Sequence, residues 1–445
     1  MSRNKKIIKT TAEFSRFLLG LTFLFSGFVK AVDPLGFTYK IQDYLVAFNS
    51  ASLFALALPV AIILIVFEFS CGVFILLGIF RKQTTLLTTL FMLIFTPFTL
   101  WIALKNPVKD CGCFGDFLII SNWETFLKNI VLLIGTIFLL LYHKRLNPLF
   151  SKKMRLAPAI FTLIFSVAFC IYNLTFLPIF DFRPFKIGAN IPSLMHIDTQ
   201  QNEEYKHTFV YRKDGKEQEF TEENYPWNDS TWTFVEMKSK LIQKSETPEI
   251  EDFSIQEMFF DPVSNSWEER EDTTEKLLSD SSYQFLMVSP LPTKKSLKQI
   301  NAFQPICRYA KENRIPFYLL SSSFTASQKP MITDCSYGLT DERVLKTMIR
   351  ANPGLLLIKK GTVLKKWNAT TLPSVKKIDA GINNNKYVQN AAGKSSAHIL
   401  LKLGLILLIF IIPMLLFKQY ERKRYYVKKQ KETTNINTFI KTDKN

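Results

Sequence analysis

The residues best placed to do chemistry are two cysteines one residue apart, in the stretch Asp110-Cys111-Gly112-Cys113-Phe114-Gly115-Asp116 between two apolar segments. A disulfide between residues i and i+2 closes a very small ring outside the relaxed geometry, so we expect the bond to be strained and easily reduced. Gly112 allows the backbone angles that a tight turn needs. The pair therefore suits a disulfide that is passed on by exchange.

The same stretch has two other interpretations. Two thiolates with the carboxylates of Asp110 and Asp116 form a possible zinc set, but thiolates at i and i+2 seldom bind one tetrahedral ion well, and no histidine is near in sequence. We therefore expect no metal, while a structural turn or a static disulfide stays open. The flanking charges oppose each other, because the carboxylates raise a thiol pKa whereas Lys105 and Lys109 lower it.

Four further cysteines complete the set. Cys71 and Cys170 fall within apolar segments, where cysteine acts as a small apolar residue. Cys307 and Cys335 fall on a predicted helix and the loop after it, and we expect a structural disulfide between them. On the chain-entropy model it would stabilise the fold by roughly 3–3.5 kcal/mol. The alternative is that they exchange with Cys111 and Cys113.

Glu68 is an ionisable residue surrounded by Ile, Val and Phe. Within a membrane such a group costs at least a few kcal/mol unless it is paired or neutral. We expect Arg16 to reach it from the preceding apolar segment. The pair is then either a structural ion pair or part of a proton or quinone site. Other polar residues near the cysteine stretch line a pocket or are ordinary interfacial residues: Lys30, Asp33, Tyr39, Asp43, Asn106, Trp123, Lys128 and Asn129.

Six apolar blocks of roughly twenty residues position these groups, a length that crosses a hydrocarbon core of about 30 Å. The predicted spans are 14–32, 53–80, 84–104, 126–142, 156–176 and 398–417. Short connections between the first four predict a four-helix transmembrane bundle, and residues 34–49 suit an amphipathic helix at the interface. The fold class is therefore an α-helical membrane protein with a soluble α/β domain.

The net charge of +18 reflects membrane topology rather than nucleic-acid binding. Twenty basic and three acidic residues, which account for +17, lie in the segments 1–12, 81–83, 143–155 and 418–445. These segments alternate along a six-span chain, as the positive-inside rule requires. We therefore expect a multi-pass protein of the inner membrane with cytoplasmic termini. The cysteine stretch and residues 177–397 would face the periplasm, where disulfides persist.

The domain organisation follows from these segments. We expect a four-span domain (1–150), a fifth transmembrane helix (151–180), a periplasmic α/β domain (181–395), a sixth transmembrane helix (396–417) and a basic cytoplasmic tail (418–445).

Strand and helix signals alternate within the large domain. We expect a hairpin at 207–220 and irregular structure at 222–231 and 261–282, followed by strand 283–288, helix 294–313, strand 315–321, helix 341–351 and a hairpin of 355–358 with 362–367. This order resembles the thioredoxin-like fold at about 250–380, and Asn352-Pro353 resembles its cis-proline. The resemblance departs at the active-site position, because Pro290-Leu291-Pro292-Thr293 stands where thioredoxins carry Cys-x-x-Cys.

The first 150 residues resemble the DoxX/MauE family of four-span membrane proteins. The matching stretches are Phe25-Ser26-Gly27-Phe28-Val29-Lys30-Ala31-Val32-Asp33-Pro34, Asn106 to Asp116, and Asn122-Trp123-Glu124-Thr125-Phe126. The whole arrangement is similar to a Bacteroidota subfamily with an added soluble domain. The resemblance implies a cytoplasmic-membrane location and an association with disulfide formation in a periplasmic dehydrogenase subunit, or with quinone-coupled thiol oxidation.

The sequence thus favours a thiol–disulfide redox protein of the inner membrane, in which Cys111 and Cys113 react and Asp110, Gly112, Asp116, Glu68 and Arg16 support them. We expect a quinone as electron acceptor near Glu68, and the lipid bilayer and a periplasmic client protein as partners. The alternative is a non-catalytic scaffold or assembly factor that binds an envelope partner through a degenerate thioredoxin-like domain. The sequence leaves open whether the protein is an enzyme.

Overall fold

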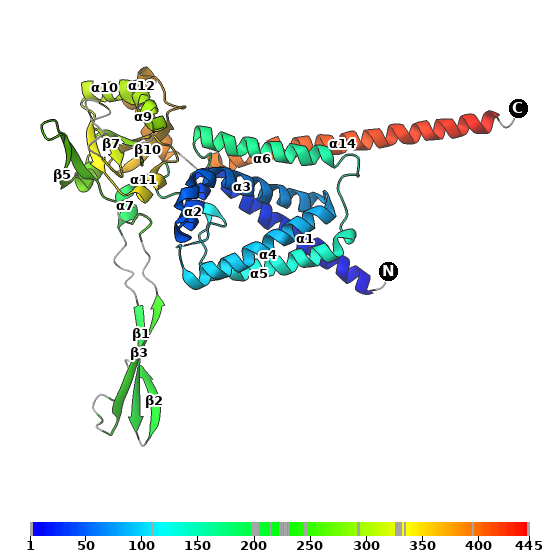
Figure 1. Cartoon of the computed structure of the whole chain (residues 1–445), viewed down its shortest axis with the longest axis horizontal. Coiled ribbons are helices and arrows are strands. Elements are labelled where there is room, and N and C mark those ends of the chain that lie inside the picture. The colour runs from blue at the N-terminus through cyan, green and yellow to red at the C-terminus, as the bar shows by residue number, and fades with distance from the viewer. Residues whose placement is uncertain are drawn as a thin grey trace.

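The computed structural model describes residues 3–108, 110–196, 204–213, 215–221, 224, 226, 229, 231–243, 248–251, 253–291, 294–324, 332, 335–393 and 396–442. Within these ranges, six helices are long and apolar enough to cross a membrane, which confirms the six expected spans. They are α1 (Arg3–Val32), α3 (Phe54–Leu77), α4 (Arg81–Lys105), α5 (Asn122–Tyr142), α6 (Leu156–Phe176) and α14 (Ser396–Thr442). A separate β-rich domain lies at one end of these helices (Figure 1).

The closest contact among the membrane helices joins α1 to α3. A Cβ at Gly27 would lie 2.4 Å from the backbone nitrogen of Phe69, and a Cβ at Gly72 would lie 2.3 Å from that of Leu24. Small residues permit such close approach of two helices within a membrane. The contact therefore brings the polar side chains of α1 directly against Glu68 of α3.

The other membrane helices and their connections complete this part of the chain. α4 packs along α5, and α6 packs against α3 and α14. As expected for residues 34–49, a short helix, α2 (Pro34–Ala47), follows α1, and the Asp33 carboxylate caps it by accepting the N–H of Gly36. Single turns of 3₁₀-helix are η1 (Ala51–Leu53), η2 (Gly115–Phe117) and η3 (His143–Arg145).

The β-rich domain is built on a seven-stranded sheet of order β10-β9-β6-β7-β8-β4-β5. β6, β7 and β8 are parallel, and the remaining neighbours are antiparallel. The strands are β4 (Gln256–Asp261), β5 (Ser266–Asp272), β6 (Tyr283–Val288), β7 (Phe317–Ser321), β8 (Ser336–Leu339), β9 (Gly354–Lys359) and β10 (Thr362–Asn368). β6 and β9 are nearly continuous apolar runs because both of their faces are buried.

Helices cover the two faces of this sheet. One face carries Phe285 and Leu357 and packs on α9, η4, α10 and α12, whereas the other carries Leu286 and Leu356 and packs on α7, α8 and α11. The helices are α7 (Ile191–Met195), α8 (Thr274–Ser279), α9 (Lys294–Ile300), η4 (Asn301–Phe303), α10 (Gln304–Glu312), α11 (Glu342–Met348), α12 (Val375–Asn383) and α13 (Lys386–Ala392). The Asn352–Pro353 peptide bond is cis, as expected.

A second sheet of three strands stands apart from the seven-stranded sheet (Figure 1). β1 (Glu204–Lys213) pairs in antiparallel fashion with β2 (Lys216–Thr221) and with β3 (Thr233–Gln243). The first pair confirms the hairpin expected at 207–220. Aromatic side chains of all three strands cluster on it, where Tyr211 contacts Phe220 and Phe234.

The structure corrects two expectations. Residues 261–282 are not irregular, because they contain all of β5 and all of α8. The charged side chains of β5 hide the pattern of a strand, which lies at the edge of the sheet. The helix of the last predicted span does not end at residue 417, because α14 continues to Thr442 as a single helix. Of the motif at 290–293, residues 292 and 293 lie outside the described residues.

Candidate functional site

The two adjacent cysteines lie in the segment that joins α4 to α5, which we call the Cys loop (residues 106–121). Gly112 has a φ of 65°, a left-handed conformation that glycine adopts without strain, and its N–H donates to Oδ1 of Asp110 at 2.8 Å. α2 lies along the loop and holds it twice. Nζ of Lys40 pairs with Oδ2 of Asp110 at 2.9 Å, and the Tyr44 hydroxyl donates to the carbonyl of Cys111 at 2.8 Å.

The two thiols are free but have different surroundings. The residues Cys111 and Cys113 are 7% and 9% exposed. The sulfur of Cys111 accepts the backbone N–H of Cys113 at 3.3 Å and lies 3.3 Å from the hydroxyl of Thr125 at the start of α5. Since these groups surround one sulfur and not the other, the local backbone stabilises a thiolate at Cys111.

The pKa values of the thiols separate in the same direction. A hydrogen bond from the Cys113 thiol, opposed by burial and aided by Thr125 and Lys128, lowers the pKa of Cys111 to about 6. The pKa of Cys113 is raised well above its ordinary value, because its thiol donates to Cys111 and because it is buried. At neutral pH, Cys111 is therefore the sulfur of the pair that ionises more readily, and Cys113 remains a thiol.

This asymmetry predicts a distinct pH profile for alkylation of the reduced protein. The labelling rate at Cys111 should rise with pH through about 6 and level off near neutrality, because the thiolate fraction is then complete. An ordinary thiol titrates near about 8.5 and would still gain reactivity at higher pH. Mass spectrometry of the labelled peptide measures the rate. The variant Thr125→Val should move the midpoint upward, and a wild-type midpoint above about pH 8 would contradict this assignment.

Directly beneath the Cys loop, a buried ion pair joins α1 to α3. Nζ of Lys30 lies 2.7 and 2.8 Å from the two carboxylate oxygens of Glu68, and the two side chains are 3% and 5% exposed. The Ser26 hydroxyl lies 2.8 Å from Glu68 Oε2 and 2.8 Å from the carbonyl of Cys113. The pair therefore connects the membrane helices to the thiol segment through a single hydroxyl.

The expected pair of Glu68 with Arg16 is wrong. Arg16 donates instead to Glu13 at 2.9 Å and to backbone carbonyls at the end of α3. Lys30 takes its place because the close packing of α1 on α3 sets that lysine, four residues after Ser26, on the helix face that meets Glu68. Glu68 thus belongs to the surroundings of the Cys loop, whereas Arg16 does not.

The ion pair uses most of the acceptor positions of Glu68. Lys30 donates to both carboxylate oxygens, and Ser26 donates to one of them as well. A quinone as electron acceptor near Glu68 stays a prediction.

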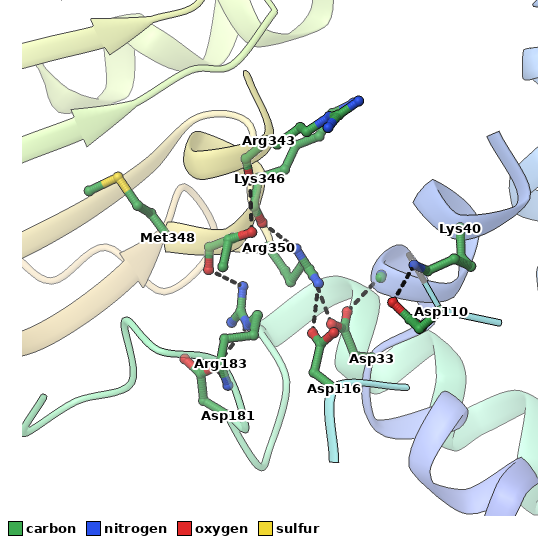
Figure 2. Close-up of polar contacts among 12 residues, drawn as sticks. Asp33, Lys40, Asp110, Asp116, Asp181, Arg183, Arg343, Lys346, Met348 and Arg350 are labelled. Atoms are coloured by element: carbon green, nitrogen blue, oxygen red, sulfur yellow. Dashed lines mark hydrogen bonds and ion pairs between the residues drawn. The ribbon is translucent and has the colours of Figure 1, made fainter. Parts of the chain in front are cut away.

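A small pocket with both charged and apolar lining residues lies at the junction of α1, α2, the Cys loop and the segment that leads into the β-rich domain. Its lining includes Lys30, Lys40, Gly112, Asp116 and Arg183. Burial raises the pKa of Asp116, which pairs with a guanidinium from the β-rich domain, Arg350, at 3.0 Å. Figure 2 shows these charged groups where the β-rich domain meets the membrane helices.

The other predicted residues divide between the loop and its periphery. Asn106 accepts a hydrogen bond from Asn122 at 3.2 Å, and Lys128 lies 4.4 Å from the ring of Phe114, so both help to hold the loop. Trp123 is exposed. Further from the thiols, the Asn129 side chain donates a hydrogen bond to the Thr99 hydroxyl, and the Tyr39 ring contacts the ammonium of Lys346. Burial raises the pKa of Asp43. Lys109 lies outside the described residues.

Cys307 and Cys335 contribute to the core of the β-rich domain rather than to this site. Both belong to the cluster on one face of the large sheet, Cys307 from α10 and Cys335 just before β8. A disulfide between them stays a prediction. Within the described ranges, no group of three or more His, Cys, Asp or Glu side chains is placed to hold a metal ion.

Several residues of the site escaped sequence reasoning. Lys40, Tyr44 and Thr125 touch the thiol segment, and Arg350 reaches it from a distant part of the chain. The i, i+4 placement of Lys40 and Tyr44 on one helix face was a usable signal for two of them. Nothing local in the sequence marks Arg350.

Two family models match separate parts of the chain. Residues 205–244, which include most of the three-stranded sheet, match a domain of unknown function (DUF8463), and no curated protein matches the chain. Residues 8–142, which include α2, the Cys loop and the Lys30–Glu68 pair, match the family described as Methylamine utilisation protein MauE. The N-terminal membrane part of this chain is therefore similar to MauE-type membrane proteins.

Proposed function

We propose that this membrane protein carries out thiol–disulfide exchange, with Cys111 and Cys113 as the reacting pair. The observation that carries the proposal is their asymmetry. The Cys111 sulfur receives the N–H of Cys113 and lies beside the Thr125 hydroxyl, whereas Cys113 keeps its proton. A reduced form stabilised in this way makes a dithiol pair a good oxidant of other thiols.

The exchange has two steps. A client thiolate attacks the sulfur of Cys111 in the Cys111–Cys113 disulfide; that bond breaks, and Cys113 leaves as a thiolate and takes up a proton. A second client thiolate then attacks the client sulfur of the mixed disulfide, and Cys111 leaves as a thiolate held by the Cys113 N–H. The client loses two electrons and gains a disulfide, and the pair gains those two electrons.

We further propose that the reaction takes place in the periplasm. The charge distribution favours cytoplasmic termini in the inner membrane. The start of α1 and the end of α14 lie at the end of the helices away from the β-rich domain, which is consistent with this topology (Figure 1). The client is then a periplasmic protein. Because the matched family is described by methylamine utilisation, an accessory role of that kind is part of the proposal.

The β-rich domain is proposed to be thioredoxin-like and to recognise the client. The order β7-β6-β9-β10, with β6 parallel to β7 and antiparallel to β9, supports this fold. At the end of β6, where such a fold would react, Ser289 donates to Asn352 at 2.8 Å, and no described residue there is a cysteine. The four helices α1, α3, α4 and α5 are proposed as the four-span unit of the DoxX/MauE type.

Redox trapping tests the proposed reaction. Membranes are treated with an oxidant or a reductant, quenched in acid and alkylated, and the peptide that carries Cys111 and Cys113 is analysed by mass spectrometry. We expect a disulfide under oxidant and two alkylated thiols under reductant. A pair that stays in one state under every condition would contradict the proposal.

A scaffold is the second candidate, and the exposed apolar side chains of β3 favour it. Phe234, Val235 and Met237 are exposed on a sheet that stands apart from the rest of the β-rich domain (Figure 1). Such a surface suits a bound envelope protein. The double variant Cys111→Ser, Cys113→Ser discriminates between the candidates, because a scaffold keeps full function at normal protein levels and an exchange protein loses it.

A further inference from the structure

Arg350 of the β-rich domain forms an ion pair with Asp116 of the Cys loop. It follows α11, and its side chain, 7% exposed, extends from that domain towards the membrane helices (Figure 2). Nε lies 2.7 Å from Oδ2 of Asp33, Nη2 lies 3.0 Å from Oδ2 of Asp116, and Nη1 donates to the carbonyl of Lys346. One buried guanidinium thus joins three segments that are far apart in the sequence.

Both carboxylates belong to elements that enclose the thiols. Asp33 caps α2, and α2 carries Lys40 and Tyr44, which hold the loop at Asp110 and Cys111. Asp116 lies in η2, at the other end of the thiol segment. Fixing these two points therefore fixes the helix and the loop relative to each other.

Two residues of α2, Gly36 and Tyr39, lie directly against the Arg350 guanidinium. A Cβ at Gly36 would lie 2.8 Å from Nη2 of Arg350 and 2.5 Å from Oδ2 of Asp33, so a side chain at position 36 would displace these groups from their present contact. The Tyr39 ring, one turn further on, lies 4.7 Å from Nζ of Lys346 and 5.4 Å from the Arg350 guanidinium. Arg350 therefore combines two ion pairs with packing against an aromatic ring, whereas an incidental surface ion pair lacks such packing.

Without Arg350, the carboxylates of Asp33 and Asp116, whose side chains are 19% and 44% exposed, would lose the guanidinium that pairs with both. Two carboxylates close together repel each other, and their partial burial limits how far water screens that repulsion. The α2–loop contact would then separate at its Asp33–Asp116 end, and the cover over the thiols comes from that contact: Cys111 packs against Tyr44, and Lys40 covers Gly112.

We propose that Arg350 is a positioning residue that keeps the thiols of the Cys loop covered while the β-rich domain is docked, so that undocking exposes them to the client. The proposal rests on the exchange reaction proposed above. It assigns the β-rich domain a second task besides client recognition, because its movement controls access to Cys111.

The test is the rate of maleimide labelling of Cys111 and Cys113 in the full-length, reduced protein in mild detergent, read by mass spectrometry. Arg350→Ala should label at least about tenfold faster than the wild type. Arg350→Lys keeps the charge but not the two-pronged geometry, and should fall between them. The matched control is Arg343→Ala, in the helix α11 that precedes Arg350. The exposed side chain of Arg343 points away from the loop (Figure 2), and its loss should leave the rate unchanged.

Cys71 and Cys170, buried among the membrane helices, report unfolding in the same experiment. If they also become reactive in Arg350→Ala, the variant has unfolded, and Asp116→Asn decides in its place by weakening one of the two ion pairs. Unchanged labelling of the loop in the folded Arg350 variant, or in Asp116→Asn when that variant decides, overturns the proposal. Labelling needs only reduced thiols, so this result is independent of whether the pair exchanges disulfides.

Discussion

Cys113→Ser is expected to accumulate a mixed disulfide between Cys111 and its client, and Cys111→Ser is expected to reduce exchange to the uncatalysed rate. The reason is the division of roles seen at the sulfurs. In the reverse direction of the proposed exchange, the Cys111 thiolate, which receives the Cys113 N–H, attacks a client disulfide and releases one client thiolate. Without a thiol at 113, the mixed disulfide that forms cannot go on to the Cys111–Cys113 disulfide. A serine at 111 leaves only a hydroxyl, which does not attack a disulfide at neutral pH.

Non-reducing electrophoresis followed by mass spectrometry of the captured partner measures this result. Cys170→Ala, within a membrane helix and fully buried, is the matched control and should behave as the wild type. Equal trapping by the two serine variants would show that the thiols are interchangeable, and would remove the basis for naming Cys111 as the nucleophile.

Glu68→Gln is expected to destabilise the protein by about 3–5 kcal/mol, because it leaves the Lys30 ammonium buried without its carboxylate. Lys30→Met should cost a similar amount for the converse reason. The double variant Lys30→Met, Glu68→Leu should recover most of the loss, because a buried ion pair replaced by apolar residues of similar size is often neutral in stability. Thermal unfolding in detergent provides the comparison.

The matched control for this series is Glu13→Gln. Glu13 pairs with Arg16 at 2.9 Å, but its side chain is 27% exposed, and such partly exposed pairs contribute at most about 1 kcal/mol. Single variants at Lys30 and Glu68 that unfold with the wild type would show that the pair does not hold α1 on α3.

The sequence predicted what depends on local pattern. Hydropathy placed the six spans, and the run Tyr283–Val288 was identified as a strand with the bounds of β6. The cysteine pair was found because two thiols at positions i and i+2 can form a disulfide whatever the surrounding fold. β6 and β9 are buried on both faces and are therefore apolar runs that can be recognised in the sequence. The edge strand β5 is charged and lacks such an apolar run, so it was missed.

The partners of charged residues were less predictable because they depend on tertiary packing. Arg16 and Lys30 were both available to Glu68, and only the glycine contact between α1 and α3 selects the lysine. Arg350 lies 317 residues from Asp33, and no local signal connects them. The site could thus be located from the sequence at its thiols but not at the groups that cover and support them.

The most direct test of the account is a single-turnover transfer. Protein oxidised at Cys111–Cys113 is purified away from oxidant, mixed without oxygen with a reduced dithiol peptide, quenched in acid and alkylated, and both partners are analysed by mass spectrometry. The account predicts that each peptide disulfide formed is matched by one pair of thiols gained at Cys111 and Cys113. A Cys111–Cys113 disulfide that persists unchanged while the peptide stays reduced, in the wild type and in Arg350→Ala alike, would contradict it.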